Sequence, residues 1–380
     1  MKLYENQEEA VLLRTGVFGG VYGGNLSAGS RFVFQAAPKC YNSYTMQVKD
    51  LGEFGVIALL NEMVINGRSG ADSGASFDFR LLVDTGDDTA AWHTGPATEL
   101  CTTDTVVEGV HFTRQTTPWR DLGWKSLASN ISDIAAMGGL PLYALVTLGL
   151  PPETEIADLK ELYLGLLEIG NQYGVSIVGG DLVRSPVVFI TVALTGVQAG
   201  QSMLRTTASP GDKLAVTGYV GGSGGGLKLM QQSSKSSAEA AEYLCKVHRR
   251  PVPDVAAGQM LINSGVVTAM DISDGLADDL SKLCLASEVS ARIFTPQIPV
   301  HPLLVEAFPN RYLDLALNGG EDYKLLFTAP QPVMERVMPQ LPEGASVIGD
   351  IIGGEPGSVV IVDSSGTETV ATRHGWDHFS

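Results

Sequence analysis

The chain has 380 residues, enough for about two domains. Hydrophobic residues make up 44% and charged residues 18%, a balance that supports a packed core and argues against extensive disorder. The net charge is −17, from 25 Lys and Arg against 42 Asp and Glu. The sequence contains no run of basic residues of the kind that neutralises a nucleic-acid backbone. We therefore expect no nucleic-acid partner. The acidity suits a protein that binds several divalent cations, but it is also common in ordinary cytoplasmic proteins.

The four cysteines are isolated, with no CxxC pair and no histidine at zinc spacing, which is typical of reduced thiols in a cytoplasmic protein. No uninterrupted apolar stretch of about 18 residues is present, so no transmembrane helix is expected. The first residues lack a basic segment leading into an apolar one, so no signal peptide is expected either. These features favour a cytoplasmic location and no membrane partner.

The predicted elements begin after an unusual N-terminal stretch. Residues 1–45 contain Gly-Gly pairs and scattered aromatic residues without periodicity, and we interpret them as an extension of unknown role that is dispensable for turnover. A helix is predicted up to Met63, followed by a Gly/Ser-rich loop at 66–75. Strands and amphipathic helices then alternate, which indicates an α/β or α+β fold. The strands are predicted at 77–83, 99–103, 143–148, 175–178 and 187–197, and the helices at 124–137 and 156–173.

A break at 199–211 separates this region from a second mixed unit, because Ser209-Pro210-Gly211-Asp212 is a turn signal. We place an N-terminal ATP- and Mg²⁺-binding domain at 46–205 and a C-terminal α/β domain at 206–380. In the second unit, strands are predicted at 213–217, 266–270, 291–294, 325–328 and 346–351, and helices at 254–263 and 276–286. The Gly-rich run at 221–226 opens another helix, and it is not a P-loop because GxxxxGK[ST] is absent.

Short motifs that place Asp beside Gly, Ser or Thr recur near the ends of apolar runs. They are GDD at 86–88, TTDT at 102–105, NISD at 130–133, GGD at 179–181 and DISDG at 271–275. Hard oxygen ligands of this kind suit Mg²⁺, and Mg²⁺ suits polyphosphates. The motifs together therefore favour magnesium-dependent phosphoryl transfer.

Each motif also has a simpler interpretation. Asp271 and Asp274 could face one metal ion, or Ser273 or Asp274 could cap the following helix. A hairpin of 77–83 with 99–103 would bring Asp88 close to Asp104, although ordinary turn chemistry also uses Asp and Thr. Asp133 lies in a helix with an apolar context, where a buried carboxylate is costly unless it faces a cation, an Arg or water.

Several longer segments resemble, in the same order, the signature of the thiamine-monophosphate kinase family, within the superfamily of aminoimidazole ribonucleotide synthetase. They are TTDTVVEGVHF at 102–112, GWKSLASNISDIAAMG at 123–138, DISDGL at 271–276, GGEDY at 319–323 and GWDHF at 375–379. The resemblance runs from about Met46 to the C-terminus. It implies a ferredoxin-like N-terminal α/β domain that dimerises through its strands, and a C-terminal α/β domain like that of aminoimidazole ribonucleotide synthetase. The implied reaction converts thiamine monophosphate and ATP into thiamine diphosphate and ADP, in thiamine diphosphate biosynthesis.

The resemblance also implies roles for individual residues. The Mg²⁺ ligands would be Asp88, Thr102, Thr103, Asp104, Asp133, Asp181, Asp271 and Asp274. ATP would contact Tyr163, Gly180, Asp181, Arg205 and Ser273, and thiamine monophosphate would contact His111, Glu321 and Trp376. One departure concerns the GGD motif, because the family commonly continues with Thr-Thr-Arg whereas this chain has Leu182-Val183-Arg184.

Elementary chemistry explains why such a reaction needs metal ions and no general base. The acceptor is a phosphate oxygen whose second pKa is about 6, so it is largely deprotonated at pH 7. The obstacle is repulsion from ATP, since each pair of unit charges at about 4 Å repels by roughly 4 kcal/mol at an effective dielectric of 20. Several Mg²⁺ ions offset this repulsion, which accounts for the number of Asp motifs.

Two other functions remain open from the sequence. One is another ATP-using member of the superfamily: aminoimidazole ribonucleotide synthetase itself, a selenophosphate synthetase, with its N-terminal reactive Cys or selenocysteine, or the hydrogenase-maturation dehydratase, with its C-terminal Cys. Here Cys40 lies outside the matched region and the chain ends in Ser380. The other is a catalytically silent module that binds a nucleotide or thiamine phosphate, and the intact Asp motifs weigh against it.

Overall fold

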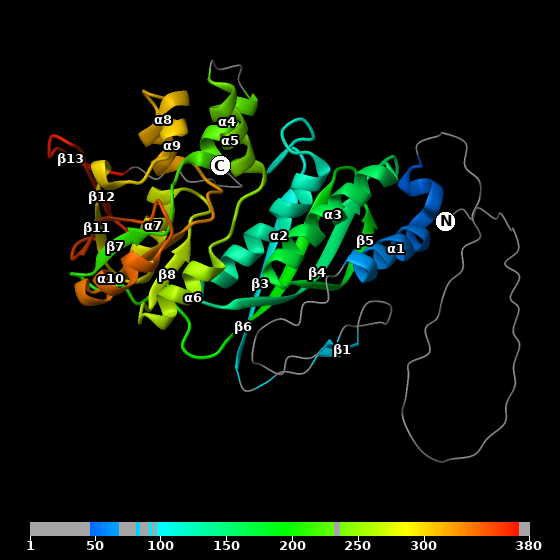
Figure 1. Cartoon of the computed structure of the whole chain (residues 1–380), viewed down its shortest axis with the longest axis horizontal. Coiled ribbons are helices and arrows are strands. Elements are labelled where there is room, and N and C mark those ends of the chain that lie inside the picture. Colours follow the sequence, from blue (N-terminus) through cyan, green and yellow to red (C-terminus); the bar gives the residue numbers. More distant parts are fainter. Residues whose placement is uncertain are drawn as a thin grey trace, which may run out of the picture. The chain divides into compact units, whose positions relative to one another are not determined.

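The computed structural model describes residues 46–67, 81–83, 91–92, 95, 97–231 and 236–371 (Figure 1). They belong to one compact unit, Thr45–Ser380. The extension at 1–45 and the predicted site residues Asp88 and Trp376 lie outside the described residues. Among the helices of the described part, none combines the length and the hydrophobicity that crossing a bilayer requires.

The N-terminal half is built around a four-stranded sheet with the strand order β3-β6-β4-β5. Strands β4 and β5 are parallel and are joined by helix α3, whereas β6 is antiparallel to both β3 and β4. The elements are α1 (Val48–Gly67), β3 (Thr98–Val107), α2 (Trp119–Ala136), β4 (Leu140–Leu150), α3 (Ile156–Tyr173), β5 (Ser176–Arg184) and β6 (Phe189–Gln198).

The predicted hairpin between 77–83 and 99–103 is wrong. Strand β1 (Leu81–Val83) pairs instead with β2 (Ala91–Trp92), while β3 pairs along its whole length with β6. Buried residues alternate along β6, at Ile190, Val192 and Leu194, so this strand offers β3 a long, half-buried ladder partner. The ladder between β3 and β6 has ten residue pairs, and cross-strand pairs stabilise a sheet. Strand β6 is therefore the partner of β3, although β1 is closer in sequence.

The C-terminal half contains a seven-stranded sheet with the order β13-β12-β9-β11-β7-β10-β8. Strands β12 and β9 are parallel and the other neighbours are antiparallel. The strands are β7 (Lys213–Val216), β8 (Thr268–Asp271), β9 (Ser290–Phe294), β10 (Leu325–Ala329), β11 (Ser346–Ile352), β12 (Val359–Val362) and β13 (Glu368–Val370). The strands predicted in this half are confirmed. So is the mixed α/β fold class.

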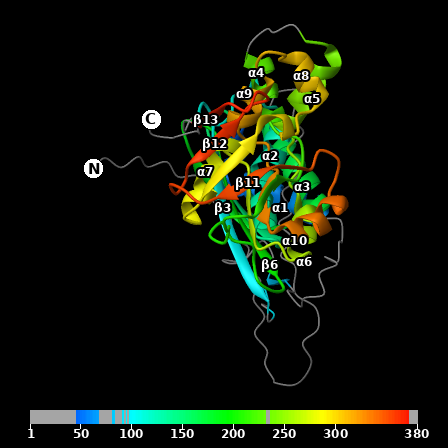
Figure 2. The same cartoon turned by 90° about the vertical axis from the view of Figure 1, so that its left-hand side faces the viewer.

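The helices of this half fall into two groups. Helices α4, α5, α8 and α9 pack together, and both views of the molecule show them side by side (Figures 1 and 2). Helix α7 covers the sheet, with buried Leu276, Leu280 and Leu283 in its core. The bounds are α4 (Gly222–Gln231), α5 (Ala238–Arg249), α6 (Val255–Asn263), α7 (Leu276–Ala286), α8 (Pro302–Ala307), α9 (Tyr312–Asn318) and α10 (Gln331–Val337), with 3₁₀ turns at Thr295–Gln297 and Met338–Gln340.

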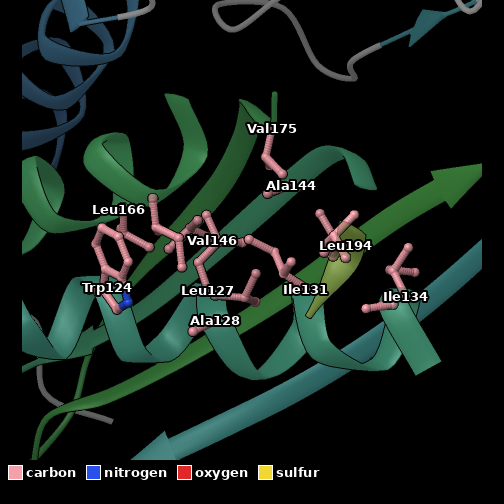
Figure 3. Close-up of a cluster of buried hydrophobic side chains, with 14 of the residues drawn as sticks. Trp124, Leu127, Ala128, Ile131, Ile134, Ala144, Val146, Leu166, Val175 and Leu194 are labelled. Atoms are coloured by element: carbon pink, nitrogen blue, oxygen red, sulfur yellow. The ribbon is translucent and has the colours of Figure 1, made fainter. Parts of the chain in front are cut away.

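Helix α2 is the element that positions the site, because it is buried along almost its entire length. Leu127, Ile131 and Ile134 face the four-stranded sheet and meet Val146 and Leu194 there (Figure 3). The helix begins at Trp119, five residues before the predicted start, and Pro118 provides its N-cap position. A Pro preceding the first turn is compatible with helix initiation, and the apolar periodicity alone does not reveal the extra turn.

Two glycines allow α2 and α3 to touch backbone to backbone. A Cβ atom at Gly123 would meet the carbonyl oxygen of Leu162 at 2.0 Å, and one at Gly165 would meet that of Arg120 at 1.8 Å. Helix α2 also contacts α6 and β8 of the C-terminal half. Polar side chains of α2 are consequently fixed between the two sheets.

Candidate functional site

Three buried or partly buried carboxylates, Asp104, Asp133 and Asp271, form the centre of the candidate site, and we call them the carboxylate trio. Asp104 lies in β3, Asp133 in α2 and Asp271 at the end of β8. Thr102, two residues before Asp104, bonds Asp133, and Ser132, next to Asp133, bonds Asp271, which places the three groups close together. The structure thus brings together three motifs that are up to 167 residues apart in sequence.

Side chains of α2 and β3 make the hydrogen bonds that hold the trio. The Thr102 hydroxyl donates to Asp133 Oδ2 at 2.5 Å, and Ser132 Oγ donates to Asp271 Oδ2 at 2.9 Å. The backbone N–H of Asp104 donates to Asn130 Oδ1 at 3.1 Å. Each carboxylate keeps oxygen lone pairs beyond these bonds, because a carboxylate has about four acceptor sites.

The electrostatics of the trio fit a bound cation. Burial raises the pKa of Asp271 to about 8, and the nearby Asp133 adds to that increase. Burial also raises the pKa of Asp133 to about 6, although the Thr102 hydrogen bond and the charge of Arg205 oppose it. The pKa of Asp104 is likewise raised by burial. Carboxylate and hydroxyl oxygens are the ligands that Mg²⁺ prefers, so the residues present fit this ion.

A second acidic cluster lies next to the trio and already contains a cation. The carboxylates of Asp274, Asp278 and Asp279 lie within 4.8 Å of one another. Lys282 Nζ contacts all three, at 2.8 Å from Asp278 Oδ2 and 3.0 Å from Asp279 Oδ1, and also bonds Asp274 Oδ2. We call these four residues the Lys282 cluster.

Asp279 fixes the loop that carries Ser273 and Asp274. Its Oδ2 accepts hydrogen bonds from three successive backbone N–H groups, those of Ser273 at 2.9 Å, Asp274 at 2.9 Å and Gly275 at 3.2 Å. The predicted capping role of Asp274 therefore belongs to Asp279, whose side chain satisfies the free N–H groups before α7.

The GGEDY loop lies against this same segment. The N–H of Glu321 donates to the Ser273 carbonyl at 2.7 Å, and the N–H of Tyr323 donates to that of Ile272 at 2.9 Å. A Cβ atom at Gly320 would meet the Ser273 oxygen at 2.6 Å, so the close approach requires glycine here. Glu321 itself has φ of 66°, an uncommon conformation for a residue with a side chain.

Glu321 is ionised because a buried lysine faces it. Lys125 Nζ lies 2.8 Å from Glu321 Oε2 and 3.2 Å from His248 Nε2. Burial opposes ionisation of Glu321, but the charge and the hydrogen bond of Lys125 outweigh it, so its pKa lies below the ordinary value. The charge of His111 also acts on both Glu321 and Asp104, so His111 lies within electrostatic reach of the GGEDY loop and of the trio.

The remaining predicted ATP residues lie in three places. Arg205 is exposed, and its charge acts on Asp133. Tyr163 is buried in the hydrophobic core on α3. Gly180 and Asp181 lie inside β5, whereas the strand predicted from the sequence ends at 178. The strand continues because Gly180 packs directly on β4, where a Cβ atom would meet the Val146 oxygen at 1.9 Å.

Asp181 lies away from the trio of the same chain. It aligns across the sheet with Thr147, Thr191 and Thr105. Because side chains alternate between the faces of a sheet, Asp181 and Asp104 point to opposite faces, and three strand spacings of roughly 4.8 Å separate β5 from β3. Thr103, the neighbour of Asp104, donates its hydroxyl to the Val192 carbonyl at 3.1 Å. The metal roles of Asp181 and Thr103 stay predictions.

Comparison with known proteins agrees with this arrangement. The family model of AIR synthase related protein, N-terminal domain, matches residues 86–198, and that of the C-terminal domain matches 209–362. The thiamine-monophosphate kinase of Aquifex aeolicus (strain VF5) is 33% identical over 337 residues, covering 88% of this chain and 100% of that protein. The enzyme of the same name from Escherichia coli O157:H7 is 35% identical over 335 residues, covering 87% and 98%. The chain belongs to the thiamine-monophosphate kinase family.

Solved structures extend the match to three dimensions. AaThiL complexed with AMPPCP and TMP is similar to this kinase-family chain with a TM-score of 0.68 and 31% identity, covering 89% of this chain and 100% of that one. Thiamine-monophosphate kinase from Stenotrophomonas maltophilia K279a gives a TM-score of 0.70 and 30% identity, covering 83% and 96%. Hydrogenase Maturation Protein HypE in complex with ATP shares the fold at 18% identity, with a TM-score of 0.67.

Sequence reasoning missed four residues that the structure places in or beside the site of this family member: Lys125, His248, Asp279 and Lys282. Lys125 carried a signal, since it lies within the GWKSLASNISDIAAMG segment, directly after Trp124. The other three are ordinary polar residues of helices α5 and α7, and only their contacts across the fold give them a role.

Proposed function

We propose that this chain transfers the γ-phosphoryl group of ATP to thiamine monophosphate, giving thiamine diphosphate and ADP. The observation that carries the proposal is the carboxylate trio, three acids from three elements that no described salt bridge neutralises. The family to which the chain belongs supports thiamine monophosphate as the phosphoryl acceptor, since relatives that match nearly the full chain have the name thiamine-monophosphate kinase. The reaction forms an anhydride bond between two phosphates, and its main barrier is charge repulsion.

The trio and Thr102 would hold Mg²⁺, together with Asp274 from the neighbouring loop and the predicted ligands Asp88, Thr103 and Asp181. Bound Mg²⁺ would supply charge neutralisation between the two phosphate-bearing substrates. The hydrogen bonds from Thr102 and Ser132 orient the carboxylates in advance, so little reorganisation is needed when the substrates arrive.

The substrates would bind on either side of the trio. Arg205 and Ser273 would contact ATP phosphates, with Gly180, Asp181 and Tyr163 completing the nucleotide site. Glu321, His111 and Trp376 would hold thiamine monophosphate, Glu321 as an acceptor for a polar hydrogen or as a counter-charge to the thiazolium ring. The bound acceptor phosphate is its own nucleophile, so the side chains orient it and do not need to remove a proton.

The assembly and the location are also proposals. We propose a homodimer formed through the N-terminal sheet, which would offer Asp181 and the other residues of its outer face to a second subunit. A cytoplasmic location would follow from the use of ATP as a co-substrate.

The first experiment measures ADP release by a coupled assay with ATP, Mg²⁺ and thiamine monophosphate. We expect turnover that requires all three, and thiamine diphosphate as a product detectable by chromatography. Unphosphorylated thiamine is the matched control, because it retains both rings but lacks the acceptor phosphate. ADP release no greater than with ATP alone would refute the proposed function.

A further inference from the structure

Lys125 is the starting point, because its amino group is buried and yet has no place in the metal or nucleotide sites. The residue lies in α2 with 3% of its side chain exposed. A buried ammonium group is costly unless it is paired and hydrogen-bonded. Here Nζ has two partners from the other half of the molecule, Glu321 Oε2 at 2.8 Å and His248 Nε2 at 3.2 Å.

The directions of these hydrogen bonds follow from the state of His248. Burial and the charge of Lys125 together lower the pKa of His248 to about 4, so the ring is neutral at pH 7. Nε2 then accepts a hydrogen bond from the ammonium group, and the ring proton lies on Nδ1. Nδ1 donates to Ser223 Oγ, 3.0 Å away.

Ser223 connects His248 to the GGEDY loop. The N–H of Ser223 donates to Asp322 Oδ1 at 3.0 Å, and the N–H of Gly221 donates to Oδ2 of the same carboxylate. The Gly-rich run that begins α4 therefore holds the side chain of Asp322, while Lys125 holds that of Glu321. Two successive residues of the loop are fixed by two different helices.

The residues that follow His248 bond to helix α2 and to the segment before it. Trp124 Nε1 donates to the Pro251 carbonyl at 2.7 Å, and the Arg250 guanidinium lies 4.4 Å above the Trp124 ring. Arg249 Nε donates to the Thr116 carbonyl at 2.6 Å. Because Trp124 is adjacent to Lys125 and Arg249 is adjacent to His248, these contacts fix the spacing between the lysine and the histidine.

Glu321 is left with one free oxygen. Its side chain is 27% exposed, Oε2 is occupied by Lys125, and no hydrogen bond among the described residues uses Oε1. A charged acceptor in a fixed orientation, beside His111, suits the exocyclic amino group or the cationic ring of a thiamine phosphate.

We infer that Lys125 and His248 are positioning residues that fix Glu321 for binding of the thiamine-phosphate acceptor, an inference that rests on the proposed function. Lys125 holds one oxygen of the carboxylate so that the other faces the acceptor. His248 orients the lysine as a neutral hydrogen-bond acceptor, and neither residue contacts ATP.

The test is a double-mutant cycle of Lys125→Met and Glu321→Gln, read as separate KM values for thiamine monophosphate and ATP. We expect Lys125→Met to raise KM for thiamine monophosphate roughly 10-fold or more, the size typical for loss of a hydrogen bond to a charged group. The KM for ATP should change less than about two-fold. In the Glu321→Gln background, Lys125→Met should add no further increase, because its effect passes through the carboxylate.

Two controls keep the outcomes distinct. Lys213→Met removes a lysine paired with Asp350 at 2.6 Å, outside the site, and should leave both KM values unchanged. If Lys125→Met alone does not fold, the comparison of Glu321→Gln with the double variant still decides, since neither leaves the buried carboxylate charge unpaired. A further rise in the double variant, or an equal rise in both KM values, would overturn the inference. An inactive wild-type enzyme would instead overturn the proposed function.

Discussion

The carboxylate trio and the Lys282 cluster are two groups of three acids that differ in one respect. In the trio, Asp104, Asp133 and Asp271 have no salt bridge among the described residues, and the charges of Arg205 and His111 act on Asp133 and Asp104 from a distance. In the Lys282 cluster, one ammonium group contacts all three carboxylates. The first group therefore has no cation of the chain bonded to it and leaves that place to a metal ion, whereas one ammonium group already contacts every carboxylate of the second.

The difference shows that proximity of carboxylates does not by itself identify a metal site. The Lys282 cluster has the tighter grouping of oxygen atoms, but the lysine already occupies its centre. In the trio, burial raises the pKa of all three groups, and no cation among the described residues bonds any of them. Uncompensated burial is the better indicator, since a structure tolerates it only where a cation is expected.

The largest expected effect comes from removing one charge of the trio. Asp133→Asn should lower kcat/KM by roughly 100-fold or more, because a metal ligand contributes at least as much as the surrounding residues that orient it. Asp278→Asn is the matched control, because Asp278 contacts Lys282 and lies outside the predicted ligand set. Steady-state kinetics with saturating Mg²⁺ provide the measurement. Equal losses in the two variants would erase the distinction between the clusters.

The second expected effect is on stability. The folded-state pKa values of Asp271 and Asp133 are raised to about 8 and about 6, above the value of about 3.9 for an unfolded Asp. The metal-free native state therefore binds these protons more tightly than the unfolded state. Its extra stability is present below about pH 4 and is lost as the pH rises through about 6 and about 8.

Thermal unfolding with a chelator should therefore show a melting temperature that falls between about pH 5 and pH 9, by about 2–4 °C for each kcal/mol lost. Mg²⁺ should remove most of this fall, because the ion stabilises the ionised carboxylates. The double variant Asp133→Asn/Asp271→Asn should flatten the profile without metal. A melting temperature that rises with pH in the chelated wild type would contradict the assignment.

The sequence predicts the members of the trio and most of the elements that carry them. The Asp motifs are local, and the helix α2 and the strands β8 and β10 show clear apolar patterns. The long-range pairing is harder to predict, because periodicity does not select a partner strand. The predicted hairpin failed for this reason, since β3 found its ladder in β6, some 90 residues further along the chain.

The contacts that separate the two acidic clusters also escape the sequence. Lys282 looks like an ordinary lysine on a helix surface, where it would make (i, i+3) and (i, i+4) pairs with Asp279 and Asp278. Its third partner, Asp274, comes from the loop before the helix, whose path depends on three backbone hydrogen bonds to Asp279. That geometry is a property of the folded loop and has no counterpart in residue spacing.

The smallest expected effect concerns Lys282 itself. Its ammonium group pairs with Asp274, a predicted metal ligand, so it competes with an incoming cation for the same carboxylate. Lys282→Gln should lower the Mg²⁺ concentration at half-maximal rate by roughly two- to five-fold, since a partly exposed ion pair contributes up to about 1 kcal/mol. Arg311→Gln, which removes the exposed partner of Asp314, serves as a control for net charge. An increased Mg²⁺ requirement in Lys282→Gln would mean that the lysine orients Asp274 for the metal and does not compete with it.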